Sequence, residues 1–308
     1  METNNDLIEQ FLAKTNKTKN ENAKCINVAI AGLPNAGKST ITNALVGEKV
    51  SIITPKAQTT RDVIRGIFVE GDTQVILIDT PGVFIPKKDR LLERKIVKNA
   101  WNGIQDADVI CIIIDSEKGI TEKVRTLIND ITKKQDKIIF VLNKVDLIKK
   151  EKLFALAKEL EEIYPKYMEL FMVSATKGDN LNKLKEYLIS LAPKRQWVFN
   201  EDEITDAPMK FLASEITREQ LFLTLREDLP YSVDVYTEKW EDFDNGDIKI
   251  QQVIRVLKDS QKAIILGKNG SKLKTISINA RKEMEEFFQR KVHLFLFVKV
   301  DTKWIEDR

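Results

Sequence analysis

The sequence predicts two domains, an α/β domain with a mostly parallel sheet followed by a smaller α+β domain. Over residues 24–192, short apolar segments typical of buried strands alternate with helical segments. This alternation indicates a parallel sheet with helices on both faces. Residues 193–205 begin at a proline and show no hydrophobic period, as expected of a linker. In residues 206–304 the order changes to helix, two strands, two helices and a strand, which predicts the α+β domain.

The bulk composition fits a globular protein without a dominant charge. The 308 residues are 43% hydrophobic and 31% charged, with a formal net charge of +3. Bulk charge therefore argues neither for nor against a nucleic-acid partner. Cys25 and Cys111 lie beside or inside apolar runs, and we expect buried, reduced thiols. With a single histidine, His293, the chain is not expected to form a structural zinc site.

The two ends of the chain contain no recognisable motif. Residues 1–23 lack the contiguous apolar core of a secretory signal, and their second half is rich in Asn, Lys and Thr. We expect a disordered N-terminal extension there and a short tail at 305–308. No run approaches the ~20 apolar residues of a membrane span. These features together predict a cytoplasmic protein.

The motif GLPNAGKS follows the first predicted strand and opens a helix, which is the context that the pattern G-x-x-x-x-G-K-[ST] requires. Glycines allow backbone N–H groups to curl around phosphate, and the helix N-terminus adds donors and positive dipole. We expect Lys38 to reach the β- and γ-phosphates and the Ser39 hydroxyl to bind Mg²⁺. The predicted phosphate-binding residues are Gly32, Leu33, Pro34, Asn35, Ala36, Gly37, Lys38 and Ser39.

A second predicted strand ends at the motif DTPGV, where we expect Asp79 to hold Mg²⁺ through water and the Gly82 N–H to contact the γ-phosphate. The polar segment 51–62 lies between the two motifs and is the predicted first switch. Thr60 is expected to complete the Mg²⁺ shell when a γ-phosphate is present, with Thr59 as the alternative. The predicted metal ligands are Ser39, Thr60 and Asp79, and the predicted nucleotide contacts of this motif are Asp79, Thr80, Pro81, Gly82 and Val83.

The motif NKVD ends a later predicted strand and indicates a guanine site. The carboxylate of Asp146 can accept from both N1–H and the 2-amino group of guanine, a pair of donors that adenine lacks. Asn143 is expected to brace the neighbouring loops, and the Lys144 stem to lie along the base. The predicted base-binding residues are Asn143, Lys144, Val145, Asp146, Ser174 and Ala175. These motifs in this order predict a Mg²⁺–GTP site.

The second domain contains the motif GKNG at 267–270, preceded by one predicted helix and followed by another helix and a strand. This is the arrangement of a KH module, whose GXXG loop clamps about four nucleotides of single-stranded nucleic acid. The domain is neutral as a whole, but residues 249–274 contain seven Lys and Arg against one Asp. Such local charge suits a phosphate-tracking groove. The predicted RNA-binding residues are Gly267, Lys268, Asn269, Gly270, Lys262, Lys272 and Lys274.

The aromatic residues near this motif are expected to be core residues rather than base-stacking platforms. The sequence does not place Trp240 or Trp304. The expected core aromatics are Phe287, Phe288, Phe295 and Phe297.

These motifs together resemble the Era family of bacterial GTPases. The resemblance rests on GLPNAGKST, KAQTTRD, DTPGV and NKVD, on a linker ending EDEITD, and on SEITREQ, LPYSV and ILGKNGSKLKTI in the second domain. It covers about residues 24–304. It implies a P-loop GTPase domain joined to a KH (type II) domain.

The resemblance also implies a function. Era-like proteins bind 16S rRNA near its 3′ end through the KH domain, hydrolyse GTP slowly and act in 30S ribosomal subunit biogenesis. For this chain we hypothesise that the GTP or GDP state switches the affinity for RNA, with tighter binding in the GTP form. The resemblance further implies peripheral association with the inner face of the cell membrane, although no basic amphipathic helix supports it. We expect a monomer. The alternative function is a tRNA-directed GTPase partner in RNA modification, which would not be expected to contain a C-terminal KH module.

Val83 occupies the position at which Ras-type hydrolases have a glutamine that orients the attacking water. The sequence therefore argues against a glutamine mechanism. We hypothesise that K⁺, held by Asn35, the phosphates and carbonyls of the first switch, offsets the developing charge. Related GTPases with the same asparagine imply this role. The expected catalytic groups are Lys38, Asn35, Thr60 and the Gly82 N–H, and 83–95 is the predicted second switch.

Overall fold

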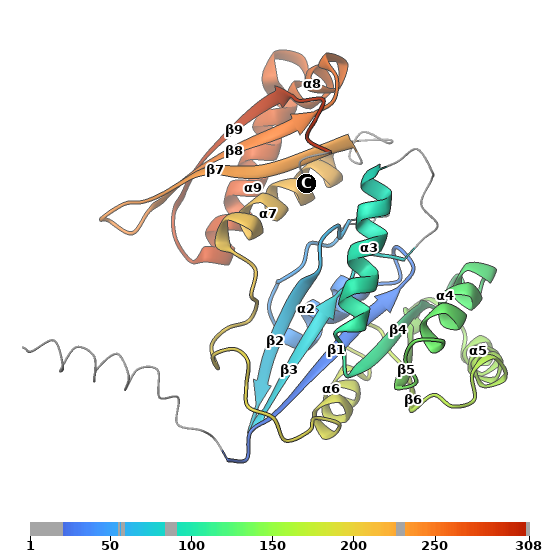
Figure 1. The fold of residues 1–308 in the computed structure, drawn as a ribbon. Helices are drawn as coiled ribbons and strands as arrows, with labels where there is room; N and C mark the ends of the chain where they lie inside the picture. Colours follow the sequence, from blue (N-terminus) through green and yellow to red (C-terminus); the bar gives the residue numbers. More distant parts are fainter. Residues whose placement is uncertain (1–20, 55, 57–58, 84–90, 226–231, 306–308) are drawn as a thin grey trace, which may run out of the picture.

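The structure is a computed structural model that describes residues 21–54, 56, 59–83, 91–225 and 232–305. It contains a six-stranded sheet in the order β2-β3-β1-β4-β5-β6 and a three-stranded sheet in the order β7-β8-β9 (Figure 1). The N-terminal extension 1–20 lies outside the described residues, as do most of the predicted tail and residues 84–90 of the predicted second switch.

The six-stranded sheet is parallel except at one edge. Its strands are β1 (Lys24–Gly32), β2 (Ile64–Glu70), β3 (Thr73–Asp79), β4 (Val109–Asp115), β5 (Ile138–Asn143) and β6 (Glu169–Met172). Only β2 runs antiparallel, because it forms a hairpin with β3 through Gly71, whose φ of 58° suits a tight turn. The central strands are almost fully buried on both faces, as their continuous apolar runs predict.

Helices cover both faces of this sheet. One face packs against α2 (Lys38–Val46) and α6 (Leu181–Ser190). The other packs against α3 (Leu91–Gln105), α4 (Glu122–Thr132) and α5 (Lys150–Ile163). The short helix η1 (Val145–Leu147) follows β5. This arrangement brings the carboxyl ends of β1, β3 and β5 to one edge, where ligands bind in open α/β sheets.

The second domain places three helices on one face of its sheet. The elements are α7 (Met209–Thr224), β7 (Val233–Asp242), β8 (Ile248–Val256), α8 (Asp259–Leu266), η3 (Lys268–Gly270), α9 (Ser271–Phe288) and β9 (Val292–Val300). Strands β7 and β8 are antiparallel, whereas β8 and β9 are parallel. The core consists of apolar residues from α7, α8, α9 and the inner sheet face. The predicted fold class, with a mostly parallel sheet and a C-terminal α+β KH domain, is confirmed.

The segment between the domains lies along the edge of the first sheet (Figure 1). The side chain of Gln74, fully buried on β3, accepts from the N–H groups of Val198 and Phe199 and donates to the Phe199 carbonyl at 2.9 Å. Further along, the Ile67 N–H donates to the carbonyl of Ile204 at 2.8 Å, and Thr205 forms a bridge with Gly66. The segment is therefore bonded to the first domain over most of its length.

Candidate functional site

The phosphate-binding motif forms a tight loop between β1 and α2. Asn35 and Gly37 have φ values of 65° and 95°, so both are in the left-handed region. A Cβ on Gly37 would lie 2.1 Å from Nδ2 of Asn143, and one on Gly82 would lie 2.7 Å from Cγ of Pro34. Both glycines are therefore required for close packing of the loops around the nucleotide position.

Lys38 is buried within this loop. Its Nζ donates to the carbonyls of Gly32 at 3.3 Å and Leu33 at 3.1 Å. An ammonium group has three donors, so one remains to face a phosphate. Burial lowers the pKa of Lys38 to about 8, and Asp79 opposes this shift. The side chain thus places a desolvated positive charge beside the loop.

The three predicted metal ligands meet beside the loop. Ser39 Oγ donates to Asp79 Oδ2 at 2.7 Å and lies 2.9 Å from Thr60 Oγ1. Asp79 is fully buried, and its Oδ1 has no hydrogen-bond partner among the described residues. Burial raises the pKa of Asp79, although the hydrogen bond from Ser39 opposes the rise. A buried carboxylate oxygen beside two hydroxyls suits a hard cation such as Mg²⁺.

The geometry distinguishes the two candidate switch threonines. Thr60 Oγ1 lies next to Ser39, whereas Thr59 Oγ1 lies 2.6 Å from Thr54 Oγ1 and donates to the Lys56 carbonyl at 2.8 Å. Both threonines line a pocket of about 60 Å³ between the phosphate loop and the first switch, so the contact with Ser39 is what distinguishes them. The structure therefore favours Thr60 over Thr59 as the metal ligand.

The DTPGV motif is fixed to β1. The Thr80 hydroxyl donates to the Ile30 carbonyl at 2.9 Å, and the Val83 N–H donates to the Gly32 carbonyl at 3.2 Å. Pro81 is buried, and Val83 packs into the apolar core with only 9% of its surface exposed. The position that would hold a water-orienting glutamine is thus part of the core.

At the base end, Asn143 links three segments. Its Nδ2 donates to the Ala36 carbonyl at 2.9 Å, its Oδ1 accepts from the Ala175 N–H at 3.1 Å, and its own carbonyl accepts from Ser116 N at 2.9 Å. Lys144 has a φ of 65°, and its ammonium bonds Asp115 Oδ2 at 2.7 Å.

The two remaining parts of the base site lie close by. Asp146 is exposed in η1, and Val145 donates from its N–H to the Val173 carbonyl at 3.2 Å. Ser174 is buried, and its Oγ accepts from Lys177 N at 3.3 Å. Asp115, which bonds Lys144, was not among the predicted residues, although an aspartate at the end of a buried strand, as at Asp79, is the pattern that could have revealed it.

The GKNG motif forms a compact loop between α8 and α9. Gly267, Asn269 and Gly270 have φ values of 69°, 51° and 74°. A Cβ on Gly267 would lie 2.8 Å from Cγ of Lys272, so this glycine has no room for a side chain. The N-terminus of α9 begins directly after the loop, and its N–H groups add positive dipole. This geometry permits the close approach of a phosphate backbone.

Positive charge is concentrated around this loop. Two of the seven basic residues in 249–274 are neutralised elsewhere, because Lys249 pairs with Glu241 and Arg255 pairs with Asp234. The predicted RNA-binding lysines differ in exposure, since Lys262 is half-buried and the others are exposed at or just after the loop. These exposed residues are Lys268, Lys272 and Lys274.

The prediction for the aromatic residues is half wrong. Phe287 and Phe288 pack in the core with Trp240, whose ring meets that of Phe288 edge-on at 5.3 Å. Phe295 and Phe297, however, are 47% and 52% exposed. They alternate with inward residues on β9, so they lie on the sheet face opposite the helices. Trp304 is fully buried with its ring 5.9 Å from the Arg255 guanidinium.

The fold and the sites define a P-loop nucleotide-binding domain joined to a KH domain. Comparison with known proteins supports both parts. A sequence profile described as a 50S ribosome-binding GTPase matches residues 27–144. A profile of the KH domain matches residues 228–305.

Similar proteins align over nearly the whole chain. GTPase Era of Brucella suis is 48% identical over 280 residues, which cover 91% of this chain and 89% of that protein. GTPase Era of Rickettsia conorii is 49% identical over 286 residues, covering 93% and 83%. The chain therefore belongs to the GTPase Era family, and it is a GTPase with a KH domain.

Two solved structures of Era share the fold of the entire chain. One is Era in complex with MgGDPNP and nucleotides 1506–1542 of 16S ribosomal RNA, with a TM-score of 0.88, 38% identity and coverage of 92% of this chain and 95% of that one. The other is an Aquifex aeolicus Era variant bound to GDP and AlF₄⁻, with a TM-score of 0.88, 37% identity and the same coverage. Within the described part of this chain, no helix has the length and apolar character needed to span a membrane.

Proposed function

We propose that this protein hydrolyses GTP with Mg²⁺, binds 16S rRNA near its 3′ end through the KH domain and acts in 30S subunit biogenesis. The observation that carries the proposal is the convergence of Ser39, Thr60 and Asp79 beside the phosphate loop. Membership of the Era family supports the RNA partner, because the similar Era structure holds both MgGDPNP and 16S ribosomal RNA.

The chain's own groups define how the nucleotide is held. The Lys38 ammonium faces the phosphates, Ser39 and Thr60 offer hydroxyl ligands to the cation, and Asp79 holds it through water. The cation supplies charge neutralisation between the phosphates. Asp146 accepts from guanine, while Asn143 keeps the base and phosphate loops in register. A guanine nucleotide is thus preferred over an adenine nucleotide.

The first switch makes binding depend on the γ-phosphate. Thr60 reaches the metal position only when segment 51–62 lies against the phosphate loop, and the Gly82 N–H adds a donor from the opposite side. Loss of the γ-phosphate removes both attachments and releases the segment. The same segment contacts the KH domain through Arg61, whose guanidinium donates to the Val233 carbonyl at 2.8 Å. The GTP form is therefore expected to bind RNA more tightly than the GDP form.

K⁺ is the proposed substitute for the missing glutamine. Asn35 lines the same small pocket as Ile52, Ile53 and Thr54 of the first switch. An amide oxygen and switch carbonyls are suitable ligands for a monovalent cation beside the phosphates, where it would offset developing charge. Hydrolysis in KCl and in NaCl, with wild type and Asn35→Ala, tests this. Faster turnover in KCl for wild type alone supports the role of K⁺, and equal rates in both salts refute it.

The remaining parts of the proposal concern organisation and location. We infer domain limits of 24–192 and 206–304, with 193–205 as the linker. A cytoplasmic monomer and a peripheral association with the inner face of the cell membrane remain predictions. Fractionation and sedimentation of the native protein test them.

The deciding experiment measures RNA affinity in each nucleotide state. A labelled single-stranded RNA with the 3′-terminal sequence of 16S rRNA is titrated with full-length protein in GDPNP or GDP, at one fixed salt concentration. Tighter binding with GDPNP supports the switch, whereas equal affinity in the two states rules it out. Co-sedimentation with 30S subunits distinguishes this function from that of a tRNA-directed GTPase.

A further inference from the structure

The first switch is held by the KH domain as well as by the nucleotide site. The Ile53 N–H donates to Glu219 Oε1 at 2.8 Å, and the Lys56 ammonium donates to the Leu225 carbonyl. Arg61, only 2% exposed, bonds the Val233 carbonyl. These contacts lie before and after Thr60 in the chain, so Ile53, Lys56 and Arg61 tie the chain around the metal-site threonine to α7, its C-terminal end and the start of β7.

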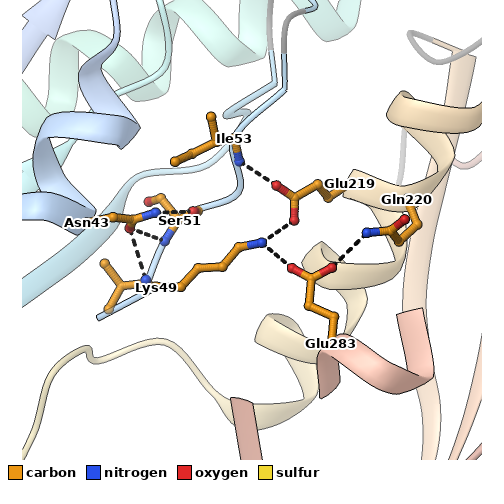
Figure 2. Close-up of polar contacts among 8 residues, drawn as sticks. Asn43, Lys49, Ser51, Ile53, Glu219, Gln220 and Glu283 are labelled. Carbon is orange, nitrogen blue, oxygen red and sulfur yellow. Dashed lines mark hydrogen bonds and ion pairs between the residues drawn. The ribbon is translucent and has the colours of Figure 1, made fainter. Parts of the chain in front are cut away.

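Glu219 is at the centre of these contacts (Figure 2). One of its oxygens accepts from Ile53 of the switch, and the other bonds Lys49. The Lys49 ammonium also bonds Glu283 on α9, and Glu283 accepts from Gln220 Nε2 at 2.7 Å. Glu219 is 4% exposed, so water does not replace these bonds easily.

The chain on the other side of this contact is also fixed (Figure 2). Asn43, on the helix that follows the phosphate loop, accepts from the N–H groups of Val50 and Ser51 at 3.0 and 2.9 Å. Its Nδ2 donates to the Ser51 carbonyl at 2.7 Å. Asn43 therefore fixes the backbone between Lys49 and Ile53. Glu219 bonds the chain on both sides of this fixed backbone, at Lys49 and at Ile53.

The charges in this cluster are unequal, since two carboxylates face one ammonium. Burial, together with Glu283, raises the pKa of Glu219 to about 7, and Lys49 opposes the rise. Burial acts to raise the pKa of Glu283, but the hydrogen bonds with Lys49, Glu219 and Gln220 and the charge of Lys49 together outweigh it, so this pKa is lowered. The groups that face Glu219 are Lys49 before the switch, Glu283 on α9 and the Ile53 N–H, while Gln220 satisfies Glu283.

The same helix that carries Glu283 also begins at the predicted RNA loop. Helix α9 starts at Ser271, directly after GKNG, and Glu283 lies 12 residues further on. At 1.5 Å per residue, the helix spans about 18 Å between them. A continuous helix transmits a displacement at one end to the other. RNA at the loop and the switch at Ile53 therefore act on one packed unit.

We propose that Glu219 is a positioning residue for GTP hydrolysis, which holds the first switch against the nucleotide through the Ile53 N–H and thereby makes turnover depend on the placement of the KH domain. This inference rests on the proposed function. Among the described residues, the polar contacts of the Glu219 carboxylate are with Lys49, the Ile53 backbone and the neighbouring carboxyl, and none is with Lys38, Ser39, Thr60 or Asp79. It acts by fixing the segment that bears Thr60.

The test uses substitutions in the full-length protein. Glu219→Met removes the acceptor, whereas Glu219→Gln keeps an oxygen for the Ile53 N–H. In both variants Lys49 keeps its ion pair with Glu283. Glu286→Met is the matched control, because Glu286 is exposed on α9 one turn beyond Glu283. The measured quantities are single-turnover hydrolysis, the affinity for a fluorescent GTP analogue, and hydrogen exchange of the peptide around Ile53 with GDPNP bound.

We expect Glu219→Met to lower the hydrolysis rate about tenfold with little change in nucleotide affinity. A tenfold change corresponds to the loss of one buried, charge-assisted hydrogen bond. Exchange around Ile53 should accelerate by a similar factor, and RNA should change the rate less than in wild type. Glu219→Gln should recover most of the rate, and Glu286→Met should behave as wild type.

Three outcomes would overturn the inference in distinguishable ways. If wild type hydrolyses GTP and binds RNA while Glu219→Met keeps the full rate and normal exchange, the positioning role is wrong and the proposed function stands. If wild type does not hydrolyse GTP, the proposed function fails and the inference fails with it. An equal loss of rate in Glu219→Gln and Glu219→Met would show that charge, not the Ile53 hydrogen bond, matters, and would also overturn it.

Discussion

Asn143 offers the sharpest test of how the nucleotide site is built. The side chain is 2% exposed, and its amide joins the phosphate loop at Ala36 to the loop of Ala175. In Asn143→Ala the Ala36 carbonyl and the Ala175 N–H both lose their hydrogen bond to the Asn143 side chain. An unsatisfied buried group costs about 1–3 kcal/mol. The Ala36 carbonyl is buried and the Ala175 N–H is half-buried, so the expected loss is at least the value for one group, out of the roughly 5–15 kcal/mol typical of a domain.

The assay is denaturant unfolding of the full-length protein without nucleotide, followed by titration with a fluorescent GDP analogue. The midpoint should fall, and nucleotide affinity should drop at least tenfold, because about 1.4 kcal/mol of bracing is a factor of ten in binding. Asn129→Ala, on the exposed face of α4, is the control and should change neither quantity. A loss below about 0.5 kcal/mol with unchanged affinity would refute the bracing role.

Three further predictions concern the base, the RNA loop and pH. Asp146→Asn should lower GTP affinity about a hundredfold or more and raise that for XTP, since the amide donor meets a carbonyl in xanthine; unchanged preference in competition binding would contradict it. The double substitution Lys268→Asp, Asn269→Asp should abolish RNA binding in a filter assay while the melting temperature stays constant, because aspartate tolerates the φ of 51° at 269. The free energy of unfolding of wild type, relative to that of Glu219→Gln, should be greatest below about pH 4.5. It should decline by up to ~1.4 kcal/mol per pH unit as pH rises through about 7, the raised pKa at which Glu219 loses its proton in the folded protein. If the free energies of unfolding of the two proteins change in parallel across that range, the prediction is excluded.

The phosphate and base motifs could be predicted from sequence because their geometry is local. A strand, a turn and a helix fix where Lys38 and Ser39 lie, and the carboxyl end of a parallel strand fixes Asp79 and Asn143. Positive φ at Gly37 is likewise a property of a few consecutive residues. Most of the nucleotide site can therefore be predicted from residues that lie close together in the sequence.

The contacts of the first switch could not be predicted in this way. Its polar composition did not indicate burial, yet Ser51, Thr60 and Arg61 are buried. Arg61 is covered by the KH domain, because its guanidinium bonds the Val233 carbonyl and lies over the Phe222 ring, both more than 150 residues further along the chain. Periodicity also failed for Phe295 and Phe297, since alternation in an edge strand does not reveal which face the helices cover.

The bonded segment between the domains limits how the KH domain can move. Gln74, Ile67 and the salt bridge of Arg65 to Asp206 at 2.7 Å fasten this segment to the first sheet almost as far as Met209, where α7 begins. Ala207 and Pro208 are all that remains between the last of these anchors and the helix. The KH domain is thus mounted on a two-residue hinge and not on a flexible tether. Because this connection is so short, a large displacement of the KH domain from the first domain requires the bonds of the segment to the first sheet to break.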